Sequence, residues 1–221
     1  MKEKIREIFF KLEADVCGIA DIERFKEAPY GFNPSDIYKE CRSIIAFGKA
    51  LPIGLKSVEP ELVYNHFKEI SMKELDLISY KAALAIEKFG GRAVPIPSNT
   101  PYEYWDDENY EGKGLVSVKH AAVLCGLGSL GKNTLFINEK FGNMLNLGVV
   151  LTNLDLKSDE LTEDLCIEEC RLCVESCPGG AISEMGIVQK KCREFSIGKN
   201  AKGFDICKCN NCRIVCPKNR V

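Results

Sequence analysis

Nine of the twelve cysteines of this 221-residue chain lie in its last quarter, where they form two copies of one pattern. The first copy is C-x3-C-x2-C-x3-C-P and the second is C-x2-C-x3-C-P, with two further cysteines before it. The nine residues are Cys166, Cys170, Cys173, Cys177, Cys192, Cys207, Cys209, Cys212 and Cys216. In tandem cluster motifs such a run gives three thiolates to one [4Fe–4S] cluster, while the cysteine before proline binds the other cluster. The spacing therefore predicts two [4Fe–4S] clusters that exchange ligands, an arrangement suited to moving single electrons.

Zinc is the main competitor for these thiols, because structural zinc sites also use C-x2-C pairs. Zinc ribbons do not need the cysteine–proline ending, which occurs twice here, so the pattern favours iron–sulfur. The first sixteen residues are charged and amphipathic and contain no apolar signal core. Because free thiols and clusters are typical of a reducing compartment, we expect a cytoplasmic iron–sulfur protein and not a disulfide framework.

Charge and hydropathy narrow the choice of partners. The net charge is −2 and the pI is near 5.9, whereas a nucleic-acid-binding surface usually shows as an excess of Lys and Arg. No such excess is obvious, although a local basic patch could hide under a neutral total. No apolar run reaches about 18 residues, the length that suggests a membrane-spanning helix, so we expect no membrane partner.

An acidic, turn-rich segment at 154–164 divides the chain into two predicted domains, residues 1–158 and 159–221. The first is predicted to be α/β, with a long helix over 61–89 that ends at Gly90-Gly91. Strands are predicted at 16–20, 43–47, 92–97, 134–138 and 145–153. A turn at 139–143 would make the last two antiparallel neighbours, which predicts a mixed sheet flanked by helices. The second domain is too small for a large core, so its stability would come largely from its clusters.

A glycine-rich loop at 126–133 (GLGSLGKN) matches two phosphate-binding patterns. It fits G-x-G-x-x-G, and it misses the P-loop pattern G-x4-G-K-[ST] by one residue. Both sites need a helix directly after the loop, but residues 134–138 are β-prone, so neither nucleotide site is predicted. Two interpretations remain: a tight structural corner, or a backbone that approaches a flat cofactor. In the second case the candidate binding residues are Lys119, His120, Gly126, Gly128, Gly131, Lys132 and Asn133.

Residues 115–217 resemble the epoxyqueuosine reductase family, and the first hundred residues do so loosely. The resemblance rests on the stretch 120–138 (HAAVLCGLGSLGKNTLFIN), on its continuation over 141–156, and on both cysteine patterns in the expected order. It implies a nitroreductase-like α/β domain that holds cobalamin, and a C-terminal ferredoxin-like module with two [4Fe–4S] clusters that supplies electrons. Reductive dehalogenases share this architecture, and flavin enzymes use the same parent fold, so FMN is the alternative cofactor.

The resemblance also implies how nine cysteines fill eight ligand positions. In the family a single cysteine follows basic residues between the two patterns, and the sequence Lys190-Lys191-Cys192-Arg193 occupies that place. One cluster would then be bound by Cys166, Cys170, Cys173 and Cys216. The other would be bound by Cys177, Cys192, Cys209 and Cys212, which leaves Cys207 spare. The remaining cysteines, Cys17, Cys41 and Cys125, lie in apolar segments and are predicted to be packing residues.

The sequence departs from the family in ways that bear on its substrate. Epoxyqueuosine reductases carry a long helical region after the clusters that helps to hold tRNA, whereas this sequence stops four residues after Pro217. Together with the acidic net charge, this predicts that tRNA is an unlikely partner. The family also places a proton-donating Asp in an Asp-Ser-Ala-Pro-like stretch before the glycine motif, and no such stretch precedes His120.

An aromatic and acidic segment at 98–111 stands in that place. One interpretation is a lid over a flat cofactor, with Tyr102, Tyr104, Asp106 or Asp107 as the proton donor. The other is a solvated surface loop.

The leading functional prediction is an iron–sulfur oxidoreductase, an enzyme similar to epoxyqueuosine reductase. Single electrons would pass from the two clusters to a cobalamin in the α/β domain, for reduction of a small-molecule substrate or a bound corrinoid. An electron-donor protein would be its partner. The alternatives are an FMN-dependent iron–sulfur reductase, and an electron-transfer or reactivation partner protein that performs no chemistry of its own.

Overall fold

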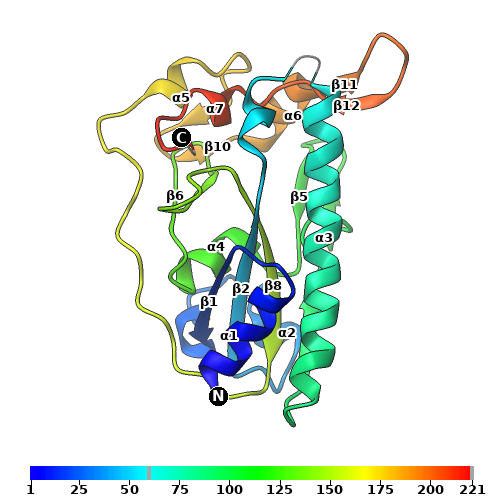
Figure 1. The fold of residues 1–221 in the computed structure, drawn as a ribbon. Coiled ribbons are helices and arrows are strands. Elements are labelled where there is room, and N and C mark those ends of the chain that lie inside the picture. Colours follow the sequence, from blue (N-terminus) through cyan, green and yellow to red (C-terminus); the bar gives the residue numbers. More distant parts are fainter. Residues whose placement is uncertain (59–60, 220–221) are drawn as a thin grey trace.

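The computed structural model describes residues 1–58 and 61–219, and a four-stranded sheet lies at its centre (Figure 1). The strand order is β1-β2-β8-β3, and every pairing is antiparallel. The strands are β1 (Val16–Asp21), β2 (Ser43–Ala50), β8 (Leu145–Thr152) and β3 (Ala93–Ile96). All of β8 and most of β2 are buried, which is why these segments are nearly continuous apolar runs in the sequence.

Helices cover both faces of this sheet. On one face lie α1 (Lys2–Lys11) and α3 (Leu62–Glu87), which pack on Ile45 and Phe47 of β2. On the other face α4 (Val118–Leu124) packs on Ile44 and Ala46. Successive side chains of a strand point to opposite faces, so alternate residues of β2 pack into the two hydrophobic cores, one on each face of the sheet.

The predicted α/β architecture is confirmed, but two details of the sheet are wrong. The sheet is antiparallel throughout and not mixed. The segment 134–138 forms only the short strand β7 (Phe136–Ile137), which pairs with β6 (Ser129–Leu130) and not with β8. The reason is Asn138, whose side-chain oxygen accepts bonds from the backbone N–H groups of Lys140 and Phe141 while its amide donates to Leu127. These bonds turn the chain after β7. The next strand, β8, therefore pairs with β2 and β3 and not with β7.

The C-terminal residues 166–219, here called the cysteine module, lie at one end of the sheet, above β6 in Figure 1. The module consists of short elements joined by loops. They are α5 (Leu172–Glu175), β9 (Ile182–Ser183), β10 (Gly186–Ile187), α6 (Gln189–Ser196), β11 (Ile197–Lys199), β12 (Asp205–Cys207) and α7 (Asn211–Ile214). The shorter elements elsewhere are η1 (Ile22–Phe25), α2 (Pro34–Ile37), η2 (Ile53–Lys56), β4 (Tyr104–Asp106) and β5 (Glu111–Lys113). Within the described ranges, none of the helices combines the length and apolarity needed to cross a membrane.

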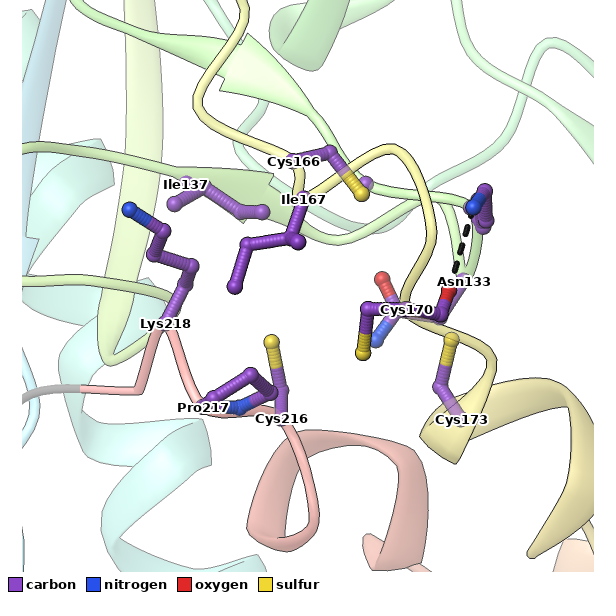
Figure 2. Close-up of a pocket in the computed structure, with 11 residues that line it drawn as sticks. Asn133, Ile137, Cys166, Ile167, Cys170, Cys173, Cys216, Pro217 and Lys218 are labelled. Carbon is purple, nitrogen blue, oxygen red and sulfur yellow. Dashed lines mark hydrogen bonds between the residues drawn. The ribbon is translucent and has the colours of Figure 1, made fainter.

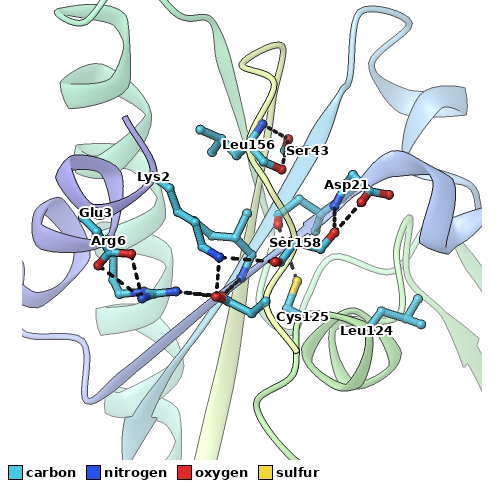
Figure 3. A network of polar contacts seen from close by, with 12 residues as sticks. Lys2, Glu3, Arg6, Asp21, Ser43, Leu124, Cys125, Leu156 and Ser158 are labelled. Atoms are coloured by element: carbon cyan, nitrogen blue, oxygen red, sulfur yellow. Dashed lines mark hydrogen bonds and ion pairs between the residues drawn. The ribbon is translucent and has the colours of Figure 1, made fainter. Parts of the chain in front are cut away.

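Residues 153–165, here called the strap, join β8 to the cysteine module without regular structure and run along the outside of the sheet domain (Figure 1). The strap is held by Asp159, whose backbone N–H donates to the carbonyl of Ile19 at 2.8 Å. The Asp159 carboxylate accepts two bonds from Arg6, at 2.7 and 2.8 Å, and lies 2.6 Å from the Lys2 ammonium (Figure 3). It also accepts the N–H of Ile19 at 2.8 Å. The segment at the predicted domain boundary is therefore tied to β1 and α1.

We expect Asp159→Asn to lower the free energy of unfolding at pH 7 by about 2–3 kcal/mol, because it removes charge-assisted hydrogen bonds to Lys2 and Arg6. Burial alone would raise the pKa of Asp159, but the bonds from Lys2, Arg6 and Ile19 outweigh burial and lower this pKa. A carboxylate with a lowered pKa stabilises the fold above the ordinary pKa of Asp, and the contribution is lost as the pH falls through the folded-state value. Urea unfolding followed by circular dichroism measures the loss. The matched control is Asp155→Asn, at an exposed position of the same strap, for which a change above about 0.5 kcal/mol would argue against this account.

Candidate metal centre

Four cysteines from both sequence patterns line one pocket in the cysteine module (Figure 2). Cys166, Cys170 and Cys173 come from the start of the module, and Cys216 comes from its end, after α7. The pocket holds about 350 Å³ of empty space, open solvent included, and Ile137, Ile167 and Pro217 also line it. Within the described residues no three His, Cys, Asp or Glu side chains come close enough to hold one metal ion. The four thiols thus line a pocket and do not converge on the position of a single metal ion.

The other five cysteines of the module form a second group, as their mutual electrostatic influence shows. Burial raises the pKa of the Cys212 thiol, Arg213 lowers it, and charges on Cys192, Cys209 and Cys177 raise it, to about 11 in all. Burial likewise raises the pKa of Cys209, with Cys207, Cys192 and Cys177 adding to it. The two groups are therefore Cys166, Cys170, Cys173 and Cys216 on one side and Cys177, Cys192, Cys207, Cys209 and Cys212 on the other.

In both groups, burial and the neighbouring cysteines raise the pKa of the thiols. In the first group burial raises the pKa of Cys173, and the neighbouring Cys216, Cys166 and Cys170 raise it again. Several thiolates close together repel one another unless a cation neutralises them, so metal binding would displace protons here and stabilise the fold. All twelve cysteines are free thiols. The three outside the module, Cys17, Cys41 and Cys125, are buried as predicted.

Two cysteines of the second group, Cys192 and Cys207, differ in their surroundings. The Cys207 thiol lies 3.3 Å from the carbonyl of Cys209, to which it donates. The side-chain amide of Asn65, on α3, donates to the Cys207 carbonyl at 2.7 Å and accepts the Cys207 backbone N–H at 2.8 Å. Cys192 lies on α6, where Ser196 hydrogen-bonds to its side chain. The choice of Cys192 as a ligand stays a prediction, and the bonds of Cys207 give it a structural role without iron.

The end of the glycine loop contacts the cysteine module. The Lys132 ammonium donates to the carbonyls of Glu168 and Cys170, the latter at 3.0 Å. Asn133, only 3% exposed, donates its amide to the carbonyl of Cys212 at 2.9 Å. Gly131, Lys132 and Asn133 also line the first cysteine pocket. Three of the predicted cofactor-binding residues thus lie beside a candidate cluster site and touch both cysteine groups.

The other two glycines of the loop approach protein backbone. Gly126 has φ +74°, and a Cβ added there would lie 2.0 Å from the carbonyl oxygen of Glu160 in the strap. A Cβ at Gly128 would lie 2.0 Å from the carbonyl oxygen of Ile137 in β7. The loop follows α4 and precedes β6, and no helix starts directly after it, as the sequence predicted. These contacts favour the structural interpretation of Gly126 and Gly128, while their cofactor role stays a prediction.

Lys119 and His120 lie on α4 and point to different surroundings. The Lys119 ammonium donates to the carbonyl of Thr134 at 2.8 Å. Burial lowers the pKa of Lys119, and the nearby Arg213 lowers it further. His120 is exposed, and its Nδ1 lies 2.7 Å from the hydroxyl of Ser117. The structure therefore directs Lys119 toward the cysteine module and leaves His120 at the surface.

The four candidate proton donors lie in or beside the β4–β5 hairpin, which is fastened to the cysteine module. Arg193 of α6 lies over the rings of Tyr102 and Trp105, 5.6 and 4.9 Å from their centroids. Hydrogen bonds from Asn109 lower the pKa of the Asp106 carboxyl. Asp107 accepts the indole N–H of Trp105 at 2.6 Å. Both carboxylates thus take part in hydrogen bonds within the hairpin. The rings of Tyr102 and Tyr104 are exposed, and the Tyr102 hydroxyl accepts a bond from Arg193 at 3.5 Å.

We expect Arg193→Ala to loosen this hairpin, because it removes the cation above two rings and a bond to the carbonyl of Tyr110. The chain has one tryptophan, Trp105, so quenching of its fluorescence by acrylamide reports on the hairpin alone. The quenching constant should rise as the indole leaves its stack with Tyr102 and becomes more exposed than its present 41%. Lys191→Ala, an exposed residue of the same helix, is the control. Equal quenching in both variants would show that Arg193 does not hold the hairpin.

One residue beside the second group was not found by sequence reasoning. Arg213 is 8% exposed, and its Nη1 has no hydrogen-bond partner among the described residues. It lies close enough to Tyr64 and Cys212 to lower the pKa of each, although burial, the larger effect, raises both. In the sequence, Arg213 directly follows Cys212, a predicted cluster ligand. The spacing of the cysteines alone gives no reason to single out this arginine.

Comparison with known proteins shows which proteins the chain resembles, although no family model matches it. The chain is 34% identical to the epoxyqueuosine reductase of Bacillus anthracis over 119 residues, 48% of this chain and 30% of that protein. It is 28% identical to the Listeria monocytogenes epoxyqueuosine reductase over 197 residues, 85% of this chain and 51% of that protein. The chain thus spans at most about half the length of these two relatives.

Solved structures show the same fold at low sequence identity. The epoxyqueuosine reductase of Streptococcus thermophilus matches all of this chain and 66% of its own, with a TM-score of 0.69 and 19% identity. A reductive dehalogenase, solved in work on B12-dependent dehalogenation, matches 99% of this chain and 32% of its own, with a TM-score of 0.69 and 16% identity. The resemblance predicted from the sequence is confirmed: the chain is similar in sequence and in fold to the epoxyqueuosine reductases.

The expectation that tRNA is an unlikely partner is wrong. An epoxyqueuosine reductase solved with an epoxyqueuosine-modified stem loop of tRNA-Tyr matches 99% of this chain and 65% of its own, with a TM-score of 0.66 and 18% identity. The error came from the total charge, which hides an uneven distribution. Residues 189–219 contain eight Lys or Arg and only two Asp or Glu. All of these basic residues except the buried Arg213 are at least partly exposed, and such a segment attracts phosphates whatever the sign of the whole chain.

Proposed function

We propose that this chain is an iron–sulfur oxidoreductase with two [4Fe–4S] clusters, related in chemistry to the epoxyqueuosine reductases. The observation that carries the proposal is the pocket lined by Cys166, Cys170, Cys173 and Cys216. Three of these thiols come from the first sequence pattern and the fourth from the second, which is the exchange of ligands that paired clusters require. The second cluster would be held by Cys177, Cys192, Cys209 and Cys212. The names of the relatives, all reductases, support the redox assignment.

We also propose a separate role for each of the two domains. Residues 1–158 form the cofactor domain, of nitroreductase type, and residues 159–221 form a ferredoxin-like module that passes electrons to it one at a time. A corrinoid is the preferred cofactor because a solved neighbour is described as B12-dependent, and FMN is the alternative. Lys132 and Asn133 would join the cofactor domain to the clusters, since they bond to carbonyls of both cysteine groups. Tyr102 and Tyr104 are the preferred proton donors.

For the substrate, we propose a modified nucleoside in tRNA or a smaller molecule of similar chemistry. The basic segment 189–219 supports the first choice, because it could contact the phosphates of a stem loop. An electron-donor protein remains part of the proposal. A chain that binds no cofactor in residues 1–158 would instead be an electron-transfer or reactivation partner.

Anaerobic reconstitution with iron and sulfide tests the proposal. We expect about eight irons per chain with the visible absorption of cubane clusters, and retention of added cobalamin after gel filtration. Retention of FMN in place of cobalamin would select the flavin alternative, and eight irons with neither cofactor would select the electron-carrier alternative. Zinc in the purified protein with no uptake of iron would overturn the proposal. Incubation of the loaded protein with epoxyqueuosine-containing tRNA and a reductant then tests the substrate.

A further inference from the structure

The outer face of α3 carries a row of exposed apolar side chains. Val63, Ile70, Leu77 and Leu84 recur every seven residues and are 37, 38, 50 and 44% exposed. Residues at this spacing lie along one side of a helix. Phe67 and Tyr80, 49 and 57% exposed, lie beside them.

The opposite face of α3 is already used by the core. Its buried residues Leu75, Ile78, Ala82 and Ile86 pack against the sheet. A surface helix normally has one apolar face and one polar face, whereas the outer face of α3 carries this apolar row among the exposed residues His66, Lys73, Glu74 and Lys81. In Figure 1, α3 runs along one side of the molecule with its outer side free.

The size of this face is that of half an interface. The six exposed side chains leave roughly 500 Å² of apolar surface, in the upper part of the roughly 300–600 Å² of the largest patch on a typical monomer, which is often functional. Two such faces, with the polar residues around them, reach the total of about 1,200–2,000 Å² that stable interfaces bury.

The face is also complementary to itself. A twofold axis between Lys73 and Glu74 would place a second α3 antiparallel to the first, so that each contact occurs twice. Val63 would then face the partner's Leu84, and Ile70 would face the partner's Leu77. Lys73 would lie beside the partner's Glu74, which gives two ion pairs at the centre. In this register the apolar heptad positions meet apolar positions.

We propose that a second copy of this chain covers the outer face of α3, in a twofold-symmetric dimer with antiparallel α3 helices. The proposal does not depend on the cofactors of either domain. Asn65, near the start of α3, holds β12 of the cysteine module. Antiparallel helices therefore place the two cysteine modules at opposite ends of the dimer, where each serves its own sheet domain.

Sedimentation velocity of the anaerobically reconstituted protein tests the proposal. The expected mass is twice the 24.7 kDa of the chain at micromolar concentration. Ile70→Lys and Leu77→Lys should each give a monomer with an unchanged circular dichroism spectrum. Phe204→Lys, at a 65% exposed residue of the cysteine module, is the control and should stay dimeric.

A charge exchange tests the register. Lys73→Glu and Glu74→Lys should each raise the dissociation constant by roughly tenfold, because each places like charges together at two sites. The double variant Lys73→Glu/Glu74→Lys should restore the wild-type dissociation constant. A monomeric wild-type protein at all concentrations would overturn the proposal, as would a dimer that survives both lysine variants. A double variant no tighter than the single ones would refute the proposed pairing.

Discussion

Cys192→Ser is expected to lower the iron content of the reconstituted protein from about eight to about four atoms per chain, while Cys207→Ser keeps about eight. Both cysteines belong to the second group, which has five thiols for four positions. The Cys207 thiol already donates to the carbonyl of Cys209, and a serine hydroxyl can replace that bond. Cys192 lies on α6, and burial together with the charges of Cys177 and Cys207 raises its pKa. A bound iron would relieve this crowding by replacing the proton.

Iron and sulfide analysis of the two variants, with electron paramagnetic resonance of the reduced protein, measures the effect. Loss of one cluster should remove the magnetic interaction between two reduced clusters, so the Cys192→Ser spectrum should simplify. Cys41→Ser is a useful control, since this buried thiol lies outside the module and bonds to backbone groups of the sheet domain, among them the carbonyl of Ser43. Iron loss in Cys207→Ser with full iron in Cys192→Ser would reverse the assignment of the eighth ligand.

Local chemistry explains which parts of this structure the sequence could predict. Segments 16–20, 43–47 and 145–153 are apolar runs that fit strands buried on both faces, and they form β1, β2 and β8. The grouping of Cys166, Cys170 and Cys173 with Cys216, which the family resemblance implies, agrees with the pocket that these four cysteines line. The short strand at 134–138 was misassigned because the Asn138 side chain, and not the β propensity of its neighbours, decides where the chain turns.

Other features depend on contacts between distant residues, which one-dimensional patterns do not carry. The basic segment 189–219 was visible in the sequence, but the total charge was a poor guide to it. The role of Lys132 depends on Cys170, thirty-eight residues away along the chain. Three glycines in a loop signal a close approach, but the sequence does not say whether the approaching group is a cofactor or another part of the chain.

Gly126→Ala is expected to lower the free energy of unfolding by about 4 kcal/mol or more, or to prevent folding. Two effects combine at this position. The residue has φ +74°, which costs a non-glycine residue about 1–2 kcal/mol, and its Cβ would lie 2.0 Å from the Glu160 carbonyl oxygen. The strap cannot easily retreat, since Asp159 beside it is bound to Arg6 and Ile19.

Gly31→Ala separates the two effects. Gly31 has φ +82°, close to that of Gly126, but no atom lies within 4 Å of the position of an added Cβ. Its substitution should therefore cost only the backbone term, about 1–2 kcal/mol. Urea unfolding of both variants by far-ultraviolet circular dichroism gives the difference, which measures the contact between the glycine loop and the strap. Equal losses in the two variants would mean that the strap yields at Glu160. A Gly126→Ala protein of near wild-type stability that no longer retains cobalamin would instead return this glycine to the cofactor site, because only a bound ligand would then meet its Cβ.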